Sequence, residues 1–296
     1  MYRLSMAVFF LFSFDASPQS NRPIKAFAGV PPVAYLVERI GGDRVSVQSL
    51  LKPGDNPHTF EPRPRDIIEI HHADLYFSVG LPFERRITQK LEKLKLVRTE
   101  EGIPSQSGVR SESTRGIHPS DDILEDDPHI WLSPPLIRIQ AKNILAGFEA
   151  LDPSAAPFYQ NNYKRLLNDL DVLDQWIVHQ FKSYPGRTFL VFHSAFGRFA
   201  DWAGLRQISI ENEGRSPSPR ELSAVIAIAK HEKIRTVFVE PQFEGRSAGA
   251  VAEAIGGRME RLDPMGTNLI ENMKTITEKI AQSFSESDKR PGDQNR

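Results

Sequence analysis

The sequence predicts an α/β protein of two lobes, each a mainly parallel sheet flanked by helices, joined by a single long rigid α-helix. Strand patterns alternate with helix patterns on both sides of the middle of the chain, which is typical of parallel sheets with crossover helices. Between these two regions, residues 152–184 carry one uninterrupted helical pattern. The 296 residues are enough for two cores of ordinary domain size.

The central helix is indicated by apolar residues that recur every three or four positions from Tyr159 to Tyr184. Asp152 is a suitable N-cap, Pro153 suits the first helical position, and Pro185 with Gly186 ends the pattern. Such a helix would span roughly 45 Å, more than the width of a small domain. We therefore expect a rigid connection between lobes; the alternative is one long core helix of a single domain. The predicted organisation is a signal peptide (1–20), a first lobe (21–151), the linking helix (152–185) and a second lobe (186–296).

The composition excludes several classes of function. A formal net charge of −1 and the absence of a long basic run give no support to nucleic-acid binding. The chain has no cysteine, which excludes disulfides, thiolate metal sites, thiol catalysis and a lipid anchor on an N-terminal cysteine. We expect a monomer.

The N-terminus is typical of a secretory signal. Arg3 precedes a short apolar run, Met6–Phe14, which is followed by the small residues Ala16 and Ser17. The run is too short to span a bilayer, although it could instead be a buried strand. We expect an exported, soluble, periplasmic protein.

The first lobe presents one histidine from a stiff loop. The predicted elements are the strands 24–28, 45–51 and 75–79 and the helices 31–40, 65–73, 83–94 and 136–150. His58 lies in the loop after the second strand, between Pro53, Pro57 and Pro62. This is where α/β sheets bind ligands, beyond the carboxyl end of a strand, so His58 is a candidate site residue.

A second histidine of this lobe is held in the same way. Residues 100–127 are rich in Ser, Gly, Asp and Glu and read as a solvated loop, with one histidine, His118. Alternatively, this acidic segment attracts cations near a cleft. The loop ends at Asp127, and His129 follows between Pro128 and the prolines that precede the next helix.

In the second lobe, three ionisable residues follow predicted strands. The strands are 188–192, 208–210, 236–239 and 259–262, and the helices are 195–203, 218–231 and 268–284, with a polar, frayed end from Ser285. His193, Glu240 and Asp263 each come at the carboxyl end of a strand. Because parallel strands end at the same rim of a sheet, we expect these three side chains to converge.

His58 and His129 from one lobe, with His193 and Asp263 from the other, make a complete set of four metal ligands. Three imidazoles and one carboxylate suit tetrahedral zinc, and manganese prefers more oxygen ligands. Four protein ligands leave no position for a reactive water, so the set favours carriage of the ion over catalysis. The alternative is a secreted zinc hydrolase with Glu240 or Glu61 as general base, and a third reading is a surface adhesin that retains the metal site.

Seven segments carry a resemblance to a known family. They are NPHTFEP, GLPFE, DPHIWLSP, HSAFGRFADWAGL, EGRSPSPREL, FVEPQF and LDP. From Ile24 to Phe284 the chain resembles the metal-specific solute-binding proteins of bacterial ABC importers, the zinc and manganese group.

The resemblance implies two α/β lobes joined by one helix, delivery of the ion to an ABC permease, and no enzymatic activity. It places the ligands at His58, His129, His193 and Asp263. Manganese-type members carry a glutamate where His193 stands, so the resemblance favours Zn²⁺, with Mn²⁺ as the alternative. It also implies that Glu240 supports the site from behind the ligands. Glu61, in the loop of His58, either supports the site in the same way as Glu240 or only packs within its loop.

Overall fold

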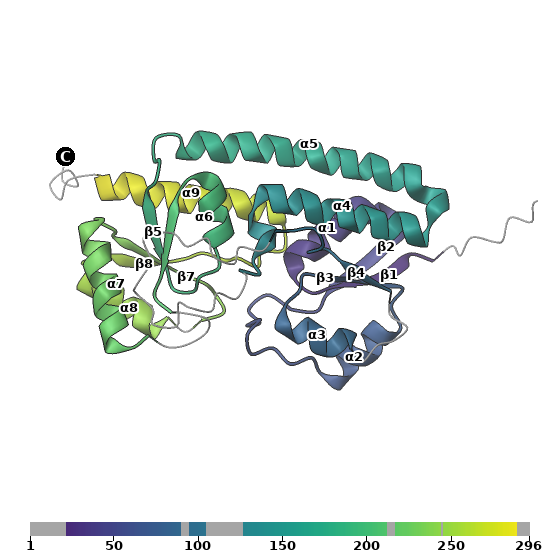
Figure 1. The fold of residues 1–296 in the computed structure, drawn as a ribbon, viewed down its shortest axis with the longest axis horizontal. Coiled ribbons are helices and arrows are strands. Elements are labelled where there is room, and N and C mark those ends of the chain that lie inside the picture. The colour runs from purple at the N-terminus through teal and green to yellow at the C-terminus, as the bar shows by residue number, and fades with distance from the viewer. Residues whose placement is uncertain (1–21, 90–94, 105–126, 212–216, 244, 289–296) are drawn as a thin grey trace, which may run out of the picture.

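The computed structural model describes residues 22–89, 95–104, 127–211, 217–243 and 245–288 (Figure 1). The predicted signal peptide and the acidic segment around His118 lie outside these residues. The described part contains two four-stranded sheets, and every pair of neighbouring strands is parallel. The predicted fold class, two parallel α/β lobes joined by one long helix, is confirmed.

The first sheet has the strand order β2-β1-β3-β4. Its strands are β1 (Ile24–Ala28), β2 (Val45–Ser49), β3 (Leu75–Ser78) and β4 (Leu96–Arg98). The helices of this lobe are α1 (Pro31–Gly41), α2 (Pro64–His71), α3 (Pro82–Thr88) and α4 (Pro134–Leu151). The prediction missed β4, which is only three residues long and too short to show a period. The last part of the helix predicted over 83–94 lies outside the described residues.

The second sheet has the strand order β6-β5-β7-β8. Its strands are β5 (Thr188–Val191), β6 (Arg206–Ser209), β7 (Thr236–Val239) and β8 (Arg258–Arg261). The helices are α6 (Gly197–Ala203), α7 (Pro219–His231), α8 (Arg246–Ala254) and α9 (Leu269–Asp288). The capping box predicted at the start of α7 is present: Ser218 Oγ accepts from the Glu221 amide, and the Glu221 carboxylate accepts from the Ser218 amide.

Two features of the second lobe differ from the prediction. Helix α8 was missed because its sequence, RSAGAVAEA, is short and consists largely of small residues, so few large apolar side chains mark a helical period. The frayed end predicted from Ser285 is wrong for residues 285–288, which continue α9; its remainder lies outside the described residues. Ser285 and Ser287 each donate a hydroxyl hydrogen bond to a carbonyl of the preceding turn, which satisfies these polar side chains within the helix.

The linking helix is α5 (Ala156–Phe181), preceded by a single 3₁₀ turn, Pro153–Ala155. Figure 1 shows α5 along one side of both lobes, with α4 and α9 beneath it. The apolar stripe of α5 is buried at Tyr159, Leu166, Leu170, Leu173, Ile177 and Phe181. At its start the Tyr159 ring stacks on Phe148 of α4 with centroids 5.0 Å apart. At its end Phe181 contacts Phe199 of α6, at a centroid distance of 5.9 Å.

One hydrophobic core therefore runs from the first sheet, along α5 and α9, to the inner face of the second sheet. A smaller core fills the space between the second sheet and the helices α7 and α8. This continuous apolar connection holds the two sheets in a defined relation and sets the frame for the site between them. Among the described residues, no helix combines the length and apolar character that crossing a bilayer requires.

Candidate metal site

The strand ends of the second sheet deliver the predicted side chains to one rim. His193 and Asp263 lie two residues beyond β5 and β8, and Glu240 follows β7 directly. Because the four strands are parallel, these positions share an edge of the sheet. A fourth residue has the same placement: Glu211 lies two residues beyond β6.

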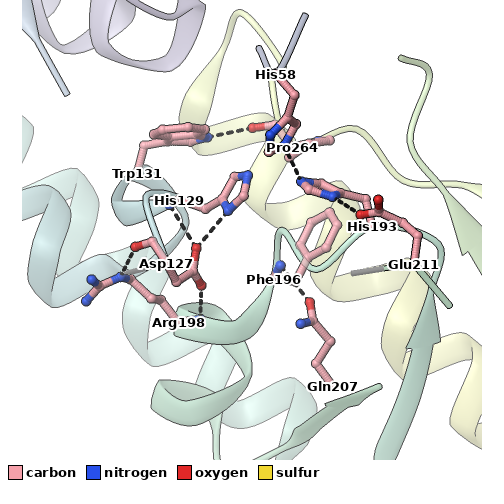
Figure 2. Close-up of polar contacts among 10 residues, drawn as sticks. All are labelled: His58, Asp127, His129, Trp131, His193, Phe196, Arg198, Gln207, Glu211 and Pro264. Atoms are coloured by element: carbon pink, nitrogen blue, oxygen red, sulfur yellow. Dashed lines mark hydrogen bonds and ion pairs between the residues drawn. The ribbon is translucent and has the colours of Figure 1, made fainter. Parts of the chain in front are cut away.

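The three candidate histidines meet between the lobes (Figure 2). The Nε2 atoms of His58 and His193 are 3.2 Å apart, and the ring centroids of His129 and His193 are 5.3 Å apart. Two nitrogen ligands of a tetrahedral zinc ion, at 2.0–2.1 Å each, lie about 3.3 Å from one another. The spacing of the His58 and His193 nitrogens therefore suits a shared metal ion.

The ring of His193 is oriented by a buried carboxylate. Its Nδ1 is hydrogen-bonded to Glu211 Oε1, and the two side chains are only 5% and 3% exposed. A carboxylate on Nδ1 places the ring proton there and leaves the lone pair of Nε2 free for a metal. Burial lowers the pKa of His193, although the bond to Glu211 opposes this, so the imidazole is in the neutral form that a metal requires.

The ring of His129 is oriented in the same way by Asp127. Asp127 Oδ1 accepts from His129 Nδ1 at 2.7 Å and from the His129 amide at 2.9 Å. Burial raises the pKa of Asp127, but the His129 ring, its hydrogen bonds and Arg198 outweigh burial and leave that pKa below its usual value. The ionised carboxylate thus fixes the Nδ1 proton of a second ligand.

His58 is the most accessible of the three histidines. Its amide donates to Asn56 Oδ1 at 2.9 Å, which closes the turn in the stiff loop. Partial burial, together with the imidazoles of His193 and His129, lowers the pKa of His58 from 6.5 to about 4. His58 is therefore neutral at physiological pH and ready to act as a ligand.

Glu240 is completely enclosed behind His193. It is 1% exposed, and its carboxylate accepts from the His193 amide at 3.2 Å. Burial, and then the charges of Glu211 and Asp263, raise the pKa of Glu240 well above its usual value. Glu240 thus contacts the backbone of a candidate ligand, while Glu211 contacts the ring.

Asp263 lies at the same rim with its carboxylate held in a turn. Its Oδ1 accepts from the Met265 amide at 2.9 Å and from Gln242 Nε2 at 3.2 Å. In the part of the chain that the structure describes, no three His, Asp or Glu side chains form a ready-made metal cage.

Glu61 has a different setting. Its side chain is 83% exposed and lies 3.9 Å from Arg86. These contacts give no support to a role behind a metal ligand, and that role stays a prediction.

Two carboxylates that contact the candidate ligands were missed at the level of sequence. Glu211 could have been found by the rule that identified His193, because it also follows a predicted strand. Asp127 stands two residues before His129, but by its sequence it marks only the end of the acidic loop.

Residues 27–283 match the model of the family described as the zinc-uptake complex component A, periplasmic (ZnuA). The chain belongs to this family. It is 28% identical to the high-affinity zinc uptake system protein ZnuA of Bacillus subtilis, a match that covers 79% of this chain and 76% of the relative.

Other relatives carry another metal in their names. The chain is 26% identical to the manganese ABC transporter substrate-binding lipoprotein PsaA of Streptococcus anginosus, over 91% of this chain and 85% of the relative. Among solved structures, a zinc-bound deletion mutant of ZnuA is 34% identical, with a TM-score of 0.80 over 88% of this chain and 98% of that one.

Membership defines the class of function. The protein is the extracytoplasmic metal-binding component of an ABC metal importer, and it is not an enzyme, which removes the predicted hydrolase alternative. Which metal it carries is a separate question, because relatives named for zinc and for manganese match at similar identity.

Proposed function

We propose that this member of the ZnuA family carries Zn²⁺, held by His58, His129, His193 and Asp263, and delivers it to an ABC permease from the periplasm as a soluble monomer. The observation that supports zinc is the gathering of three imidazoles, two of them oriented through Nδ1 by carboxylates. Three nitrogen ligands favour zinc over manganese, which prefers oxygen.

Delivery follows from the division of the ligands between the lobes. His58 and His129 come from the first lobe, and His193 and Asp263 come from the second. An ion that bonds to all four draws the lobes together, and α5 limits the movement to a small tilt. The closed form is then the form that the permease recognises.

The test is metal analysis of the purified mature protein, followed by competition between Zn²⁺ and Mn²⁺ for the apo form. We expect one equivalent of zinc, held far more tightly than manganese and weakened in His193→Ala. His231→Ala is a matched control, because the His231 side chain is 87% exposed and lies at the end of α7.

Each other result has a definite meaning. Preferential retention of manganese would keep the importer and overturn the choice of metal. Failure to bind either ion stoichiometrically would overturn the site. X-ray scattering of the protein with and without zinc tests closure, which is refuted if the apo form is already as compact as the loaded form.

A further inference from the structure

The short segment that carries His129 is bonded to the opposite lobe at both of its ends. This segment, Asp127–Trp131, belongs in sequence to the first lobe and leads into α4. Its contacts with the second lobe do not involve a metal ion, and they extend beyond the ligand set proposed above (Figure 2).

At one end, Arg198 of α6 holds Asp127. The Arg198 Nε donates to the Asp127 carbonyl at 2.7 Å, and the Arg198 amide lies 3.3 Å from Asp127 Oδ2. Arg198 is buried, with 6% of its surface exposed. The other oxygen of the Asp127 carboxylate accepts from the His129 ring. Asp127 is therefore the single residue that links Arg198 to the imidazole of a candidate ligand.

At the other end, Trp131 is bonded to the residue that follows Asp263. The Trp131 Nε1–H donates to the Pro264 carbonyl at 2.8 Å, and Trp131 is completely buried. This bond ties the segment of one candidate ligand, His129, to the turn of another, Asp263.

The space beside Asp127 is also restricted. A Cβ atom added to Gly197, at the start of α6, would lie 3.0 Å from Asp127 Oδ2. A glycine at this position lets the backbone of the second lobe approach the carboxylate closely.

We infer that Arg198 is a positioning residue for metal binding: from across the cleft it holds Asp127, and through Asp127 the ring of His129, in the orientation that binds the ion. The inference rests on the proposed function. Hydrogen bonds between the two lobes, in addition to the bonds between the ion and its ligands, then set how long the metal stays bound.

The experiment measures zinc release from the loaded protein after mixing with excess chelator. In Arg198→Met the side-chain hydrogen bonds to the carbonyls of Asp127 and Pro104 are lost, while the contact of the residue 198 amide with the Asp127 carboxylate and most of the side-chain volume are kept. We expect release about tenfold faster, equivalent to about 1.4 kcal/mol. Arg198→Lys keeps a donor and should restore part of the slow release. The absorption spectrum of the Co²⁺-loaded Arg198→Met protein should shift, because the His129 ring is no longer fixed.

Arg206→Met is the matched control. The Arg206 Nε also donates to a backbone carbonyl, that of Gly186 at 3.1 Å, but this bond lies within the second lobe. This variant should release zinc at the wild-type rate and keep the Co²⁺ spectrum.

If Arg198→Met fails to fold, Trp131→Phe removes the bond at the other end of the segment and should also speed release. Wild-type release and an unchanged Co²⁺ spectrum in a folded Arg198→Met protein would overturn the inference and leave the proposed function intact. Failure of the wild-type protein to bind zinc would overturn the proposed function itself.

Discussion

The bond between His193 and Glu211 gives the sharpest test of how the site works. Glu211 is buried and accepts a hydrogen bond from Nδ1 of a candidate ligand. In Glu211→Gln the shape of the side chain is kept, but the charge is lost and the amide NH₂ competes for the same position. The His193 ring then loses the acceptor that fixes its Nδ1 proton.

The size of the effect follows from the burial of the pair. Hydrogen bonds to charged groups contribute about 1.5–3 kcal/mol, and both side chains are at most 5% exposed, so solvent does little to replace the bond. Loss of a carboxylate behind a metal-bound histidine weakens metal affinity by about 10–100-fold. We therefore expect zinc affinity to fall by about 10–100-fold, less than in His193→Ala.

The assay is a competition titration of the apo protein with a chromophoric zinc chelator. Glu240→Gln is the matched control, because Glu240 is equally buried but contacts the amide of His193 and not its ring. A glutamine oxygen can still accept from that amide, so affinity should stay within about threefold of wild type. Wild-type affinity in Glu211→Gln, alongside a clear loss in His193→Ala, would refute the reasoning.

Three further predictions concern stability and charge. Burial, only partly offset by hydrogen bonds from the Val79 and Leu81 amides and the Tyr76 hydroxyl, raises the pKa of Glu84 from 4.5 to about 7. The native state therefore binds more protons than the unfolded state between these values, so this residue should lower the free energy of unfolding as pH rises from about 4.5 to about 7, by about 3 kcal/mol. Denaturant unfolding at pH 5 and pH 8 should show most of this loss in wild type and in the exposed-site control Glu61→Gln, but not in Glu84→Gln; an equal loss in Glu84→Gln would contradict it. Phe148→Ala removes the ring that stacks on Tyr159 and should reduce the free energy of unfolding by about 3–5 kcal/mol, measured by urea unfolding; a change below about 1 kcal/mol would show that the site is poorly packed. Asp263→Asn removes the negative charge that offsets the ion and should weaken zinc binding at least tenfold in the same chelator titration, with unchanged unfolding of the apo form as the control; unaltered affinity would remove Asp263 from the ligand set.

The sequence alone was sufficient for the fold class and for the rim of the second sheet. The hydrophobic periods are local properties, so the long linking helix and the strands and helices other than β4 and α8 could be predicted in order. The alternation of these elements implies parallel sheets, and parallel strands end at one edge. That rule by itself places His193, Glu240 and Asp263 at one edge.

Only the tertiary structure decided which side chains touch across the cleft. Arg198 reaches Asp127 from the other lobe and from a distant part of the sequence. The bond between His193 and Glu211 joins two neighbouring strand ends of the second sheet, whereas Asp127 stands only two residues before His129. Glu61 shows the converse, since a carboxylate three residues from His58 points to solvent. Periodicity encodes which face of an element is buried, but it does not encode where a polar side chain in a loop points. For that reason the bonds of Arg198 with Asp127 and of Trp131 with Pro264 became visible only when the two lobes were packed along α5.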